Sequence, residues 1–260
     1  MSNKDKIVVA IVTFYPNLET LRFKLACQTI GNAIANGHKV VVVDGSPQKG
    51  IIEETFEGLG ALVFREKFVK DIHSGLGTAK RQSLFHAMEI ANQCNLAGVL
   101  ADEAEKDFSP FIPTLLAKLD SSRDVVVPAR TRAGWESYPE QQIQTEGEAN
   151  ATFCQVTGLA IDIMFGPVLI GVNAMRHFIL QNPSKLGFPN TYAQHLGVLQ
   201  KILLDADGRD EVHGCEVDFL YPPEQRAEEE GDKTVEQKRI NQRDTLSAGY
   251  RSVAKILNVE

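Results

Sequence analysis

Residues 40–46 read Val-Val-Val-Val-Asp-Gly-Ser, and this stretch decides the class of fold. Four consecutive β-branched apolar residues are typical of a strand that is buried on both faces of a sheet. Asp44 and Gly45 then end the strand, because both residue types favour turns. Asp44 could accept hydrogen bonds from a base or a ribose, or it could belong to an ordinary Asp-Gly turn. A second run of this kind spans residues 7–12 and ends in the loop Thr-Phe-Tyr-Pro-Asn.

Helical and strand-like segments alternate around these two runs. Residues 18–36 carry apolar side chains at helical spacing, and Gly37 stands where a helix C-cap belongs. We expect further helices at residues 51–59, 78–95, 108–119, 174–180 and 198–204, and further strands at residues 61–64, 97–100, 125–127 and 216–221. The order strand, helix, strand is the pattern of an α/β domain with a mostly parallel sheet. Since ligands of such sheets bind beyond the carboxyl ends of the strands, the loops after Val12, Val43 and Leu100 should line one crevice.

The second half of the chain is less regular. Residues 130–150 are polar and contain the only tryptophan, Trp135, so we expect a mobile binding loop there. From Glu224 the chain is strongly charged, yet apolar residues recur at helical spacing and predict a helix packed on the domain. These apolar residues are Val235, Ile240, Leu246, Tyr250, Val253 and Leu257. We therefore expect one α/β domain, residues 1–225, and a charged helical C-terminal extension packed on it, residues 226–260.

The composition is that of an ordinary globular protein. The 260 residues are 43% hydrophobic and 23% charged, which indicates neither disorder nor a fibrous protein. The formal net charge of −7, from 27 basic and 34 acidic residues, argues against a nucleic-acid-binding protein, which is usually basic. The four cysteines fit no zinc framework. No apolar stretch reaches the roughly 20 residues of a membrane span and no signal peptide is evident, so we expect a cytoplasmic protein.

Three carboxylates follow the strand predicted at residues 97–100. Asp102, Glu103 and Glu105 would stand at its carboxyl end, beside the predicted crevice. Hard divalent cations prefer carboxylate oxygens, and Mg²⁺ often takes only one or two of them. In an extended segment, Glu103 and Glu105 would point to the same side and could share one metal ion. The alternative is a solvated turn that opens the next helix, where acidic side chains suit the helix dipole.

A glycine-containing segment precedes the helix predicted at residues 78–95. Residues 74–81 read Ser-Gly-Leu-Gly-Thr-Ala-Lys-Arg. Glycines let the backbone approach a ligand, and a helix N-terminus favours phosphate. Lys80 and Arg81 could add compensating positive charge. The alternative is an ordinary loop followed by a helix that starts at Thr78, because the segment matches neither the P-loop nor the dinucleotide-binding pattern.

Four segments together carry a resemblance that none of them carries alone. In order along the chain they are residues 9–17 (VAIVTFYPN), 40–46 (VVVVDGS), 75–87 (GLGTAKRQSLFHA) and 99–107 (VLADEAEKD). Their order and spacing resemble those of GT-A glycosyltransferases, and in particular the family 2-like members of that class. The resemblance extends over residues 7–225. It implies a single Rossmann-like GT-A domain that binds a nucleoside diphosphate sugar and an acceptor.

The resemblance also implies roles for particular residues. The donor nucleotide would be held by Thr13, Tyr15 and Asp44. The diphosphate would lie close to Gly75, Gly77, Lys80, Arg81 and Asp102. A divalent metal ion, Mg²⁺ or Mn²⁺, would bind Glu103 and Glu105. The acceptor would contact Trp135 and Gly166.

The sequence departs from the family pattern at two places. The acidic motif reads Asp-Glu-Ala-Glu rather than Asp-x-Asp. Inverting members carry an acidic catalytic base before a late helix, but residues 190–195 read Asn-Thr-Tyr-Ala-Gln-His and contain no carboxylate. A retaining reaction is therefore slightly favoured. His195 could replace the acid as catalytic base, act as a late metal ligand, or be a structural histidine. Trp135 could stack on a sugar ring or anchor its own segment to the core.

The sequence thus predicts a metal-dependent glycosyltransferase, more narrowly a hexosyltransferase. One alternative is a nucleotidyltransferase that makes nucleotide sugars. Such enzymes usually carry a glycine-rich, arginine-containing signature after the first strand, where this chain has Thr-Phe-Tyr-Pro-Asn. The other alternative is a non-catalytic binding protein of the same fold, which would explain the missing late carboxylate. The sequence is also compatible with a homo-oligomer.

Overall fold

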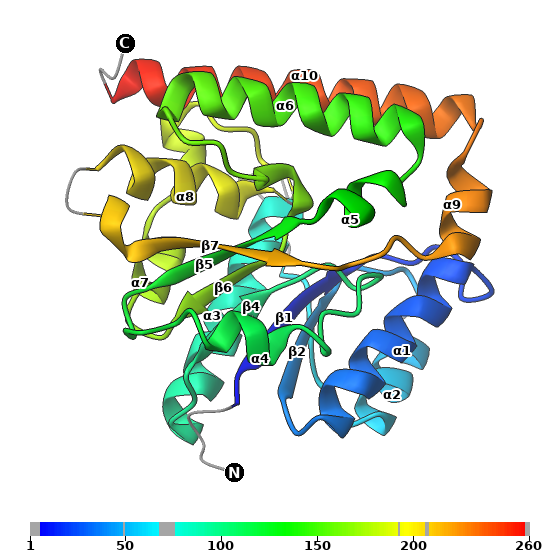
Figure 1. The fold of residues 1–260 in the computed structure, drawn as a ribbon. Helices are drawn as coiled ribbons and strands as arrows, with labels where there is room; N and C mark the ends of the chain where they lie inside the picture. The colour runs from blue at the N-terminus through cyan, green and yellow to red at the C-terminus, as the bar shows by residue number, and fades with distance from the viewer. Residues whose placement is uncertain (1–5, 49, 68–75, 192, 206–207, 258–260) are drawn as a thin grey trace.

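A single mixed sheet forms the centre of the molecule. The computed structural model describes residues 6–48, 50–67, 76–191, 193–205 and 208–257. Within these residues seven strands lie in the order β3-β2-β1-β4-β6-β5-β7. They are β1 (Val8–Thr13), β2 (Lys39–Asp44), β3 (Leu62–Arg65), β4 (Gly98–Ala101), β5 (Val125–Arg130), β6 (Val168–Gly171) and β7 (Val212–Val217). Only β6 runs antiparallel to its neighbours, β4 and β5, so the mostly parallel sheet expected from the sequence is confirmed (Figure 1).

Helices cover both faces of this sheet. They are α1 (Leu21–Ala35), α2 (Ile51–Gly58), α3 (Leu76–Cys94), α4 (Ile112–Leu116), α5 (Arg132–Glu136), α6 (Glu140–Thr157), α7 (Met175–Leu180), α8 (Gln194–Leu204), α9 (Pro223–Glu229) and α10 (Lys233–Ile256). Short 3₁₀ turns are η2 (Ile163–Phe165), η3 (Pro183–Leu186) and η4 (Arg209–Glu211). None of the described helices is both long and apolar enough to cross a membrane.

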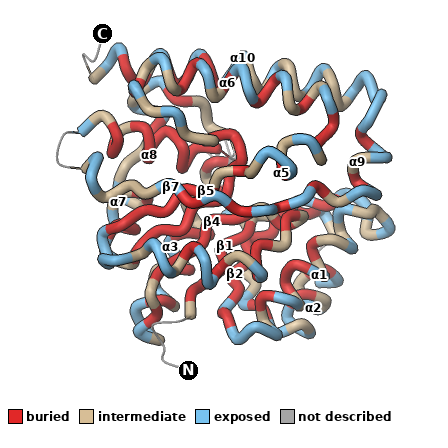
Figure 2. The backbone as a smooth tube through the Cα atoms, viewed as in Figure 1, coloured by how far each residue is buried: buried red, intermediate tan, exposed pale blue. Residues whose placement is uncertain are grey.

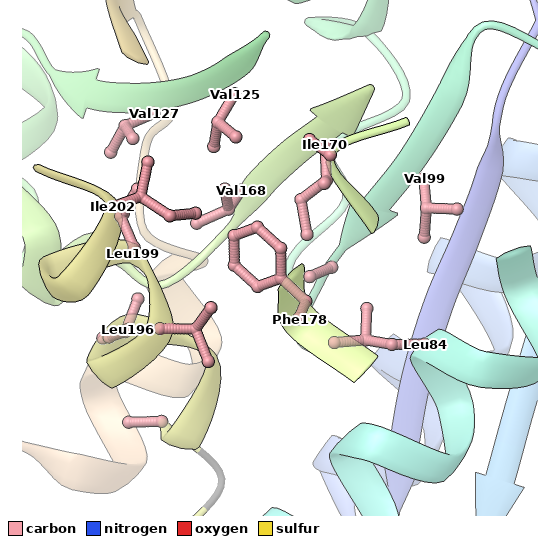
Figure 3. Close-up of a cluster of buried hydrophobic side chains, with 14 of the residues drawn as sticks. Leu84, Val99, Val125, Val127, Val168, Ile170, Phe178, Leu196, Leu199 and Ile202 are labelled. Atoms are coloured by element: carbon pink, nitrogen blue, oxygen red, sulfur yellow. The ribbon is translucent and has the colours of Figure 1, made fainter. Parts of the chain in front are cut away.

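Alternate residues of the central strands enter two separate cores. Val8 and Ala10 of β1 pack with side chains of α3, α7 and α8 on one face of the sheet. Val9 and Ile11 pack with side chains of α1, α2 and α4 on the other face. Phe178 lies in the middle of the first core (Figure 3). Because β1 is buried on both sides, its sequence is apolar throughout instead of alternating with polar residues.

Local signals set the ends of two helices. The Thr20 hydroxyl accepts a hydrogen bond from the Phe23 amide at 3.3 Å and so caps α1. Gly37 follows α1 with φ of +79°, a conformation that glycine adopts without strain. At the start of α10 the Asp232 carboxylate accepts a hydrogen bond from the Thr234 amide at 2.7 Å. The caps explain why both helices begin where their apolar periodicity begins.

The C-terminal helix α10 packs on the domain, as the sequence predicted. It lies beside α6 along most of its length, and its inner side is buried (Figures 1 and 2). Leu246, Tyr250 and Val253 are almost completely inaccessible. The Tyr250 ring meets Phe153 of α6 edge-on, with centroids 5.1 Å apart. Fully burying one side chain of this size stabilises the fold by about 1.5–3 kcal/mol.

The expectation of a mobile loop at residues 130–150 was wrong. This stretch holds α5 and most of α6. Its polar side chains Gln142, Thr145 and Glu146 are buried, because each finds hydrogen-bonding partners inside the protein. A polar segment whose side chains are mostly hydrogen-bonded can therefore form a buried helix without an aliphatic stripe.

Two element boundaries also differ from expectation. The last strand was expected at residues 216–221, but β7 runs from Val212 to Val217, because it pairs with β5 from Val125 to Arg130. The helix expected at residues 108–119 is shortened to α4. Residues at its expected start contribute instead to an aromatic cluster, in which Phe108 stacks on Phe219 at 5.2 Å.

Candidate functional site

The carboxyl ends of the parallel strands open into one cavity of about 640 Å³. The loops after β1, β2 and β4 all contribute, as expected from the parallel topology. Val12 at the end of β1 lines the cavity, and Phe14, Gly45 and the run from Asp102 to Lys106 come from these loops. The remaining lining residues are Arg22, Glu66, Lys80, Gln142, Glu146, Met164, Gly166, His195, Tyr221, Gln225, Lys238, Arg239 and Gln242. The helices α6, α9 and α10 thus close the cavity on the side opposite the sheet.

The carboxylate of Asp44 is engaged in hydrogen bonds and an ion pair within the protein. The residue is completely buried, and its carboxylate accepts hydrogen bonds from the Thr13 hydroxyl at 2.8 Å and the Ser46 hydroxyl at 2.5 Å. Arg65 adds an ion pair at 2.6 Å. These contacts tie the ends of β1, β2 and β3 together. Thr13 and Asp44 therefore lie behind the cavity wall, where they shape the loops that carry Phe14 and Gly45.

Tyr15 connects the first loop to the acidic turn. Its hydroxyl donates to Glu105 Oε1 at 3.2 Å, and its amide donates to Ser46 Oγ at 2.8 Å. Burial of the ring raises the pKa of Tyr15, and the nearby charge of Glu105 raises it further. The hydroxyl therefore stays protonated and can act as a permanent donor to the Glu105 carboxylate.

Lys80 lies in the first turns of α3 with its ammonium group at the cavity. The residue is 5% exposed, and Nζ donates to the backbone oxygen of Asp102 at 2.8 Å. Burial lowers the pKa of Lys80 to about 8, although the charges of Asp102 and Glu103 act in the opposite direction. At neutral pH the group still carries its proton. It is thus a desolvated cation placed at the wall of the cavity.

The other residues of the glycine-containing segment have different surroundings. A side chain on Gly77 would collide with Asn190 and come within 2.8 Å of the Thr191 backbone oxygen. The glycine is therefore needed for close packing between α3 and the segment before α8. Arg81 is only half-buried and does not belong to the cavity lining. Gly75 lies outside the described residues.

The acidic segment after β4 is a turn, so the extended chain on which the expected same-side geometry of Glu103 and Glu105 rested is absent there. The Lys106 amide donates to the Glu103 backbone oxygen at 3.2 Å and closes the turn. Glu103 and Glu105 nevertheless both line the cavity. Glu103 Oε2 lies 3.2 Å from Lys106 Nζ, whereas Glu105 receives the Tyr15 hydroxyl. The two carboxylates are therefore held by different partners.

The three acidic residues of the turn differ in the direction in which their pKa values are shifted. Burial raises the pKa of Asp102 well above its usual value. Burial would also raise the pKa of Glu103, but the positive charges of Lys106 and Arg239 outweigh it and lower the pKa. The pKa of Glu105 is raised by burial, which Arg22 offsets only in part. Glu103 is therefore the carboxylate most firmly kept as an anion.

The acidic turn also bears on the expected metal ion. Within the described ranges of the chain, no group of three or more His, Cys, Asp or Glu side chains is arranged to hold a metal. Glu103 and Glu105 still provide two hard oxygen donors at one cavity wall. Two carboxylates suffice for Mg²⁺, which usually completes its coordination with water and substrate phosphates. The chemistry of this donor set fits such an ion.

His195 and Gly166 are brought together. His195 lies in the first turn of α8, is 5% exposed, and has Nε2 at 2.9 Å from the Gly166 backbone oxygen. A carbonyl oxygen can only accept, so Nε2 carries the proton and only Nδ1 could act as a base. Gly166 has φ of +101°, and a side chain there would come within 2.7 Å of Glu103 Oε1. Both residues belong to the cavity wall.

Trp135 is placed differently from the acceptor-binding role expected of it. Its half-buried ring stacks on the guanidinium of Arg130, 3.5 Å from the ring centroid, and it is not part of the cavity lining. Arg130 is fully buried and pairs with Glu146 at 2.5 Å and with Asp162 at 2.7 Å. Burial would lower the pKa of Arg130, but these two carboxylates outweigh it and raise the pKa. Trp135 thus anchors its segment to a buried ion-pair network.

Several basic residues of the cavity were not predicted from the sequence. Arg22 comes from α1, Lys106 from the acidic turn, and Lys238 and Arg239 from α10. The charged C-terminal segment was expected to pack on the domain, but no pattern in it indicated that it would line a binding site. Lys238 and Gln242 are four residues apart. This spacing could have suggested that both side chains lie on the same face of a helix.

Comparison with known proteins bears on the fold. No protein-family model matches the chain, and no curated protein matches it in sequence. Among solved structures, a mycobacterial protein is similar over 95% of this chain and 76% of its own, with a TM-score of 0.54 and 13% identity. Glucosyl-3-phosphoglycerate synthase of M. tuberculosis is similar over 94% of this chain and 81% of its own, with a TM-score of 0.50 and 15% identity. The fold of this chain is therefore similar to the GT-A-like fold of these structures.

Proposed function

We propose that the protein is a glycosyltransferase that moves a hexose from a nucleoside diphosphate sugar to an acceptor held in the cavity. The observation that carries this proposal is Lys80, a cation that is 5% exposed and lines the cavity at the carboxyl end of the sheet. Among the described residues it donates to a backbone oxygen rather than to a carboxylate. A desolvated cation of this kind favours an anionic ligand, and the GT-A-like fold supports a diphosphate as that ligand.

The chain's own residues would position the donor and stabilise its leaving group. The nucleotide would lie against Phe14 and Gly45, in the loops that Thr13, Tyr15 and Asp44 hold in shape. The diphosphate would lie between the start of α3 and the acidic turn, where the helix N-terminus and Lys80 face developing negative charge. The acceptor would enter from the side of Met164 and Gly166.

We also propose that a divalent cation, Mg²⁺ or Mn²⁺, binds with the donor. Glu103 and Glu105 would hold it, since both line the cavity and offer hard oxygen ligands. When bound, such an ion would neutralise charge on the departing diphosphate. Lys106 and the Tyr15 hydroxyl, which contact these carboxylates, would fix their orientation.

Retention of the anomeric configuration is the finer part of the proposal. An inverting displacement requires a base that takes the acceptor's proton at hydrogen-bond distance. The Glu146 carboxylate, which lines the cavity, is already engaged by Arg130 and Gln142. His195 uses Nε2 to bind a carbonyl oxygen. In a retaining reaction the leaving phosphate oxygen can take the proton instead, so the protein has only to position the reactants.

The test is to incubate the protein with a panel of hexose nucleotides, with and without Mn²⁺, and to follow release of nucleoside diphosphate. Wild type should release diphosphate and bind it with a rise in melting temperature. Lys80→Met should abolish both effects. Lys39→Met, which removes an exposed lysine at the amino end of β2, is the matched control. Pyrophosphate formed from a sugar phosphate and a nucleoside triphosphate would identify a nucleotidyltransferase, and binding without turnover a non-catalytic protein.

A further inference from the structure

A second group of cations lines the cavity on the side opposite the sheet. Arg22 of α1 and Lys238 and Arg239 of α10 all belong to the lining. Arg22 is more than two hundred residues from Lys238 and Arg239 in the chain, and the three meet because α9 and α10 pack back onto the domain. The chain as a whole has a net charge of −7, so this concentration of positive charge runs against its overall character.

One carboxylate holds the two arginines in place. Glu229 of α9 binds Arg22 at 3.1 Å through Oε1 and Arg239 at 3.2 Å through Oε2. The same carboxylate also accepts hydrogen bonds from the Tyr221 hydroxyl at 2.9 Å and the Gln225 amide at 3.1 Å. Glu229 is only 7% exposed. Its carboxylate therefore holds the two guanidinium groups in position beside the cavity.

Lys238 adds a third positive charge next to this pair. Among the described residues it forms no ion pair, and it is exposed at the edge of the cavity. Partial desolvation lowers the pKa of Lys238, and the charges of Arg22 and Arg239 lower it further. The carboxylates of Glu229 and Glu105 raise the pKa of Lys238 but do not offset these effects. Glu229 forms ion pairs with Arg22 and Arg239, and the charges of Glu105 and Glu103 also act on these arginines.

We propose that Arg22, Lys238 and Arg239 form an anion subsite that binds a phosphate group of a substrate. This inference rests on the proposed transferase function for the identity of the ligand. The phosphate could belong to the diphosphate of the donor or to a separate phosphorylated acceptor, because both would enter the same cavity. In either case, the C-terminal extension supplies part of the binding site, and the arginines provide planar donors suited to phosphate oxygens.

The experiment measures binding to the full chain by calorimetry, with UDP, GDP and ADP as donor probes and inorganic phosphate as the second probe. Lys238→Glu is the test variant, because the side chain is exposed and its replacement should leave the fold intact. Arg22→Gln is a second variant that removes one arginine and keeps Glu229 bound to the other. Lys255→Glu changes the same charge on an exposed position of α10 away from the cavity, and unfolding curves check that all variants fold.

If the subsite binds the donor, Lys238→Glu and Arg22→Gln should weaken nucleoside diphosphate binding about tenfold, and Lys255→Glu should not. If it binds an acceptor phosphate, inorganic phosphate should bind together with the nucleotide, and only phosphate binding should be lost in the two variants. Unchanged binding of both probes in both folded variants would overturn the inference and leave the transferase proposal standing. Loss of phosphate binding in a protein that binds no nucleotide would support the subsite and refute the transferase.

Discussion

The ammonium group of Lys80 lies 2.8 Å from the backbone oxygen of Asp102, so the start of α3 is tied directly to the end of β4. These two elements carry the glycine-containing segment and the acidic turn, the two strongest chemical signals in the sequence. The contact places a buried cation and a turn with three carboxylates at one wall of one cavity. Binding of a diphosphate and a divalent ion would require this juxtaposition.

The first prediction concerns the pH dependence that Lys80 contributes. Its pKa is about 8 in the folded protein and 10.5 in the unfolded chain. Between these values the unfolded chain binds more protons, so the free energy of unfolding contributed by Lys80 should increase as the pH rises. Below pH 8 both states are protonated and the cost of burying the charge is fully present. Urea unfolding of wild type and Lys80→Met should be measured from pH 7 to 10. The free energy of unfolding of wild type should rise relative to that of the variant. If the two free energies change in parallel with pH, the lowered pKa of Lys80 is contradicted.

The second prediction concerns the metal. Glu103→Gln together with Glu105→Gln should remove the part of donor binding that depends on Mn²⁺, because neutral amide oxygens bind a hard divalent cation more weakly than carboxylates do. The amide at position 105 can still accept the Tyr15 hydroxyl, so the fold should be retained. Calorimetry with nucleoside diphosphate, with and without Mn²⁺, provides the measurement. A double variant that binds the nucleotide and Mn²⁺ as tightly as wild type would show that these carboxylates are not the ligands.

The third prediction concerns the buried ion-pair network behind the cavity. Arg130→Met should lower the free energy of unfolding by about 3–5 kcal/mol, because it leaves Glu146 and Asp162 buried without their cation. The exposed pair between Arg132 and Glu136 offers a matched control, and Arg132→Met should leave stability close to that of wild type. Chemical unfolding measures both. A small effect at Arg130 would mean that water reaches the two carboxylates.

The network also shows why part of the fold could not be predicted from the sequence. Strands β1 and β2 are buried on both faces, so continuous apolar runs reveal them and fix the class of fold. The buried side of α6 instead presents Gln142 and Glu146, which read as solvated polar residues. Gln142 donates to Glu146, and Glu146 pairs with Arg130 of another element. No local sequence pattern indicates such an ion pair. The segment was therefore misread as a loop.

The candidate site was predictable only at the level of loops. Parallel topology places the ends of β1, β2 and β4 at one edge, and the cavity lies there. Which side chains face it depends on packing: Asp44 turns inward to Thr13 and Arg65, and Trp135 stacks on Arg130. The contribution of α10 could not be read in advance, because helical spacing predicts an apolar face but not the surface that it covers.

The fourth prediction tests how far the C-terminal helix stabilises the domain. Tyr250→Ala should lower the free energy of unfolding by about 3–5 kcal/mol, since the ring is fully buried between Phe153 and Phe188. Tyr250→Phe keeps the ring and should have a small effect, because the hydrogen bond of the hydroxyl among the described residues is a weak one to the Met164 sulfur at 3.8 Å. Native-state hydrogen exchange should show slow exchange over residues 246–254. Rapid exchange there would contradict the packing of α10 as a stable part of the domain.

The last prediction concerns stereochemistry. If the protein transfers a sugar, the first-formed product should keep the anomeric configuration of the donor, which NMR of the early reaction mixture reports directly. His195 is the main alternative base, because it lines the cavity and could accept a proton at Nδ1 while Nε2 donates to Gly166. His195→Gln preserves a donor for the Gly166 carbonyl and removes the titrating imidazole. A retaining enzyme should keep most of its turnover in this variant. The fall of its turnover at acidic pH should be the same as in wild type. An inverted product, together with loss of turnover in His195→Gln, would assign the base to His195 and refute the retaining reaction.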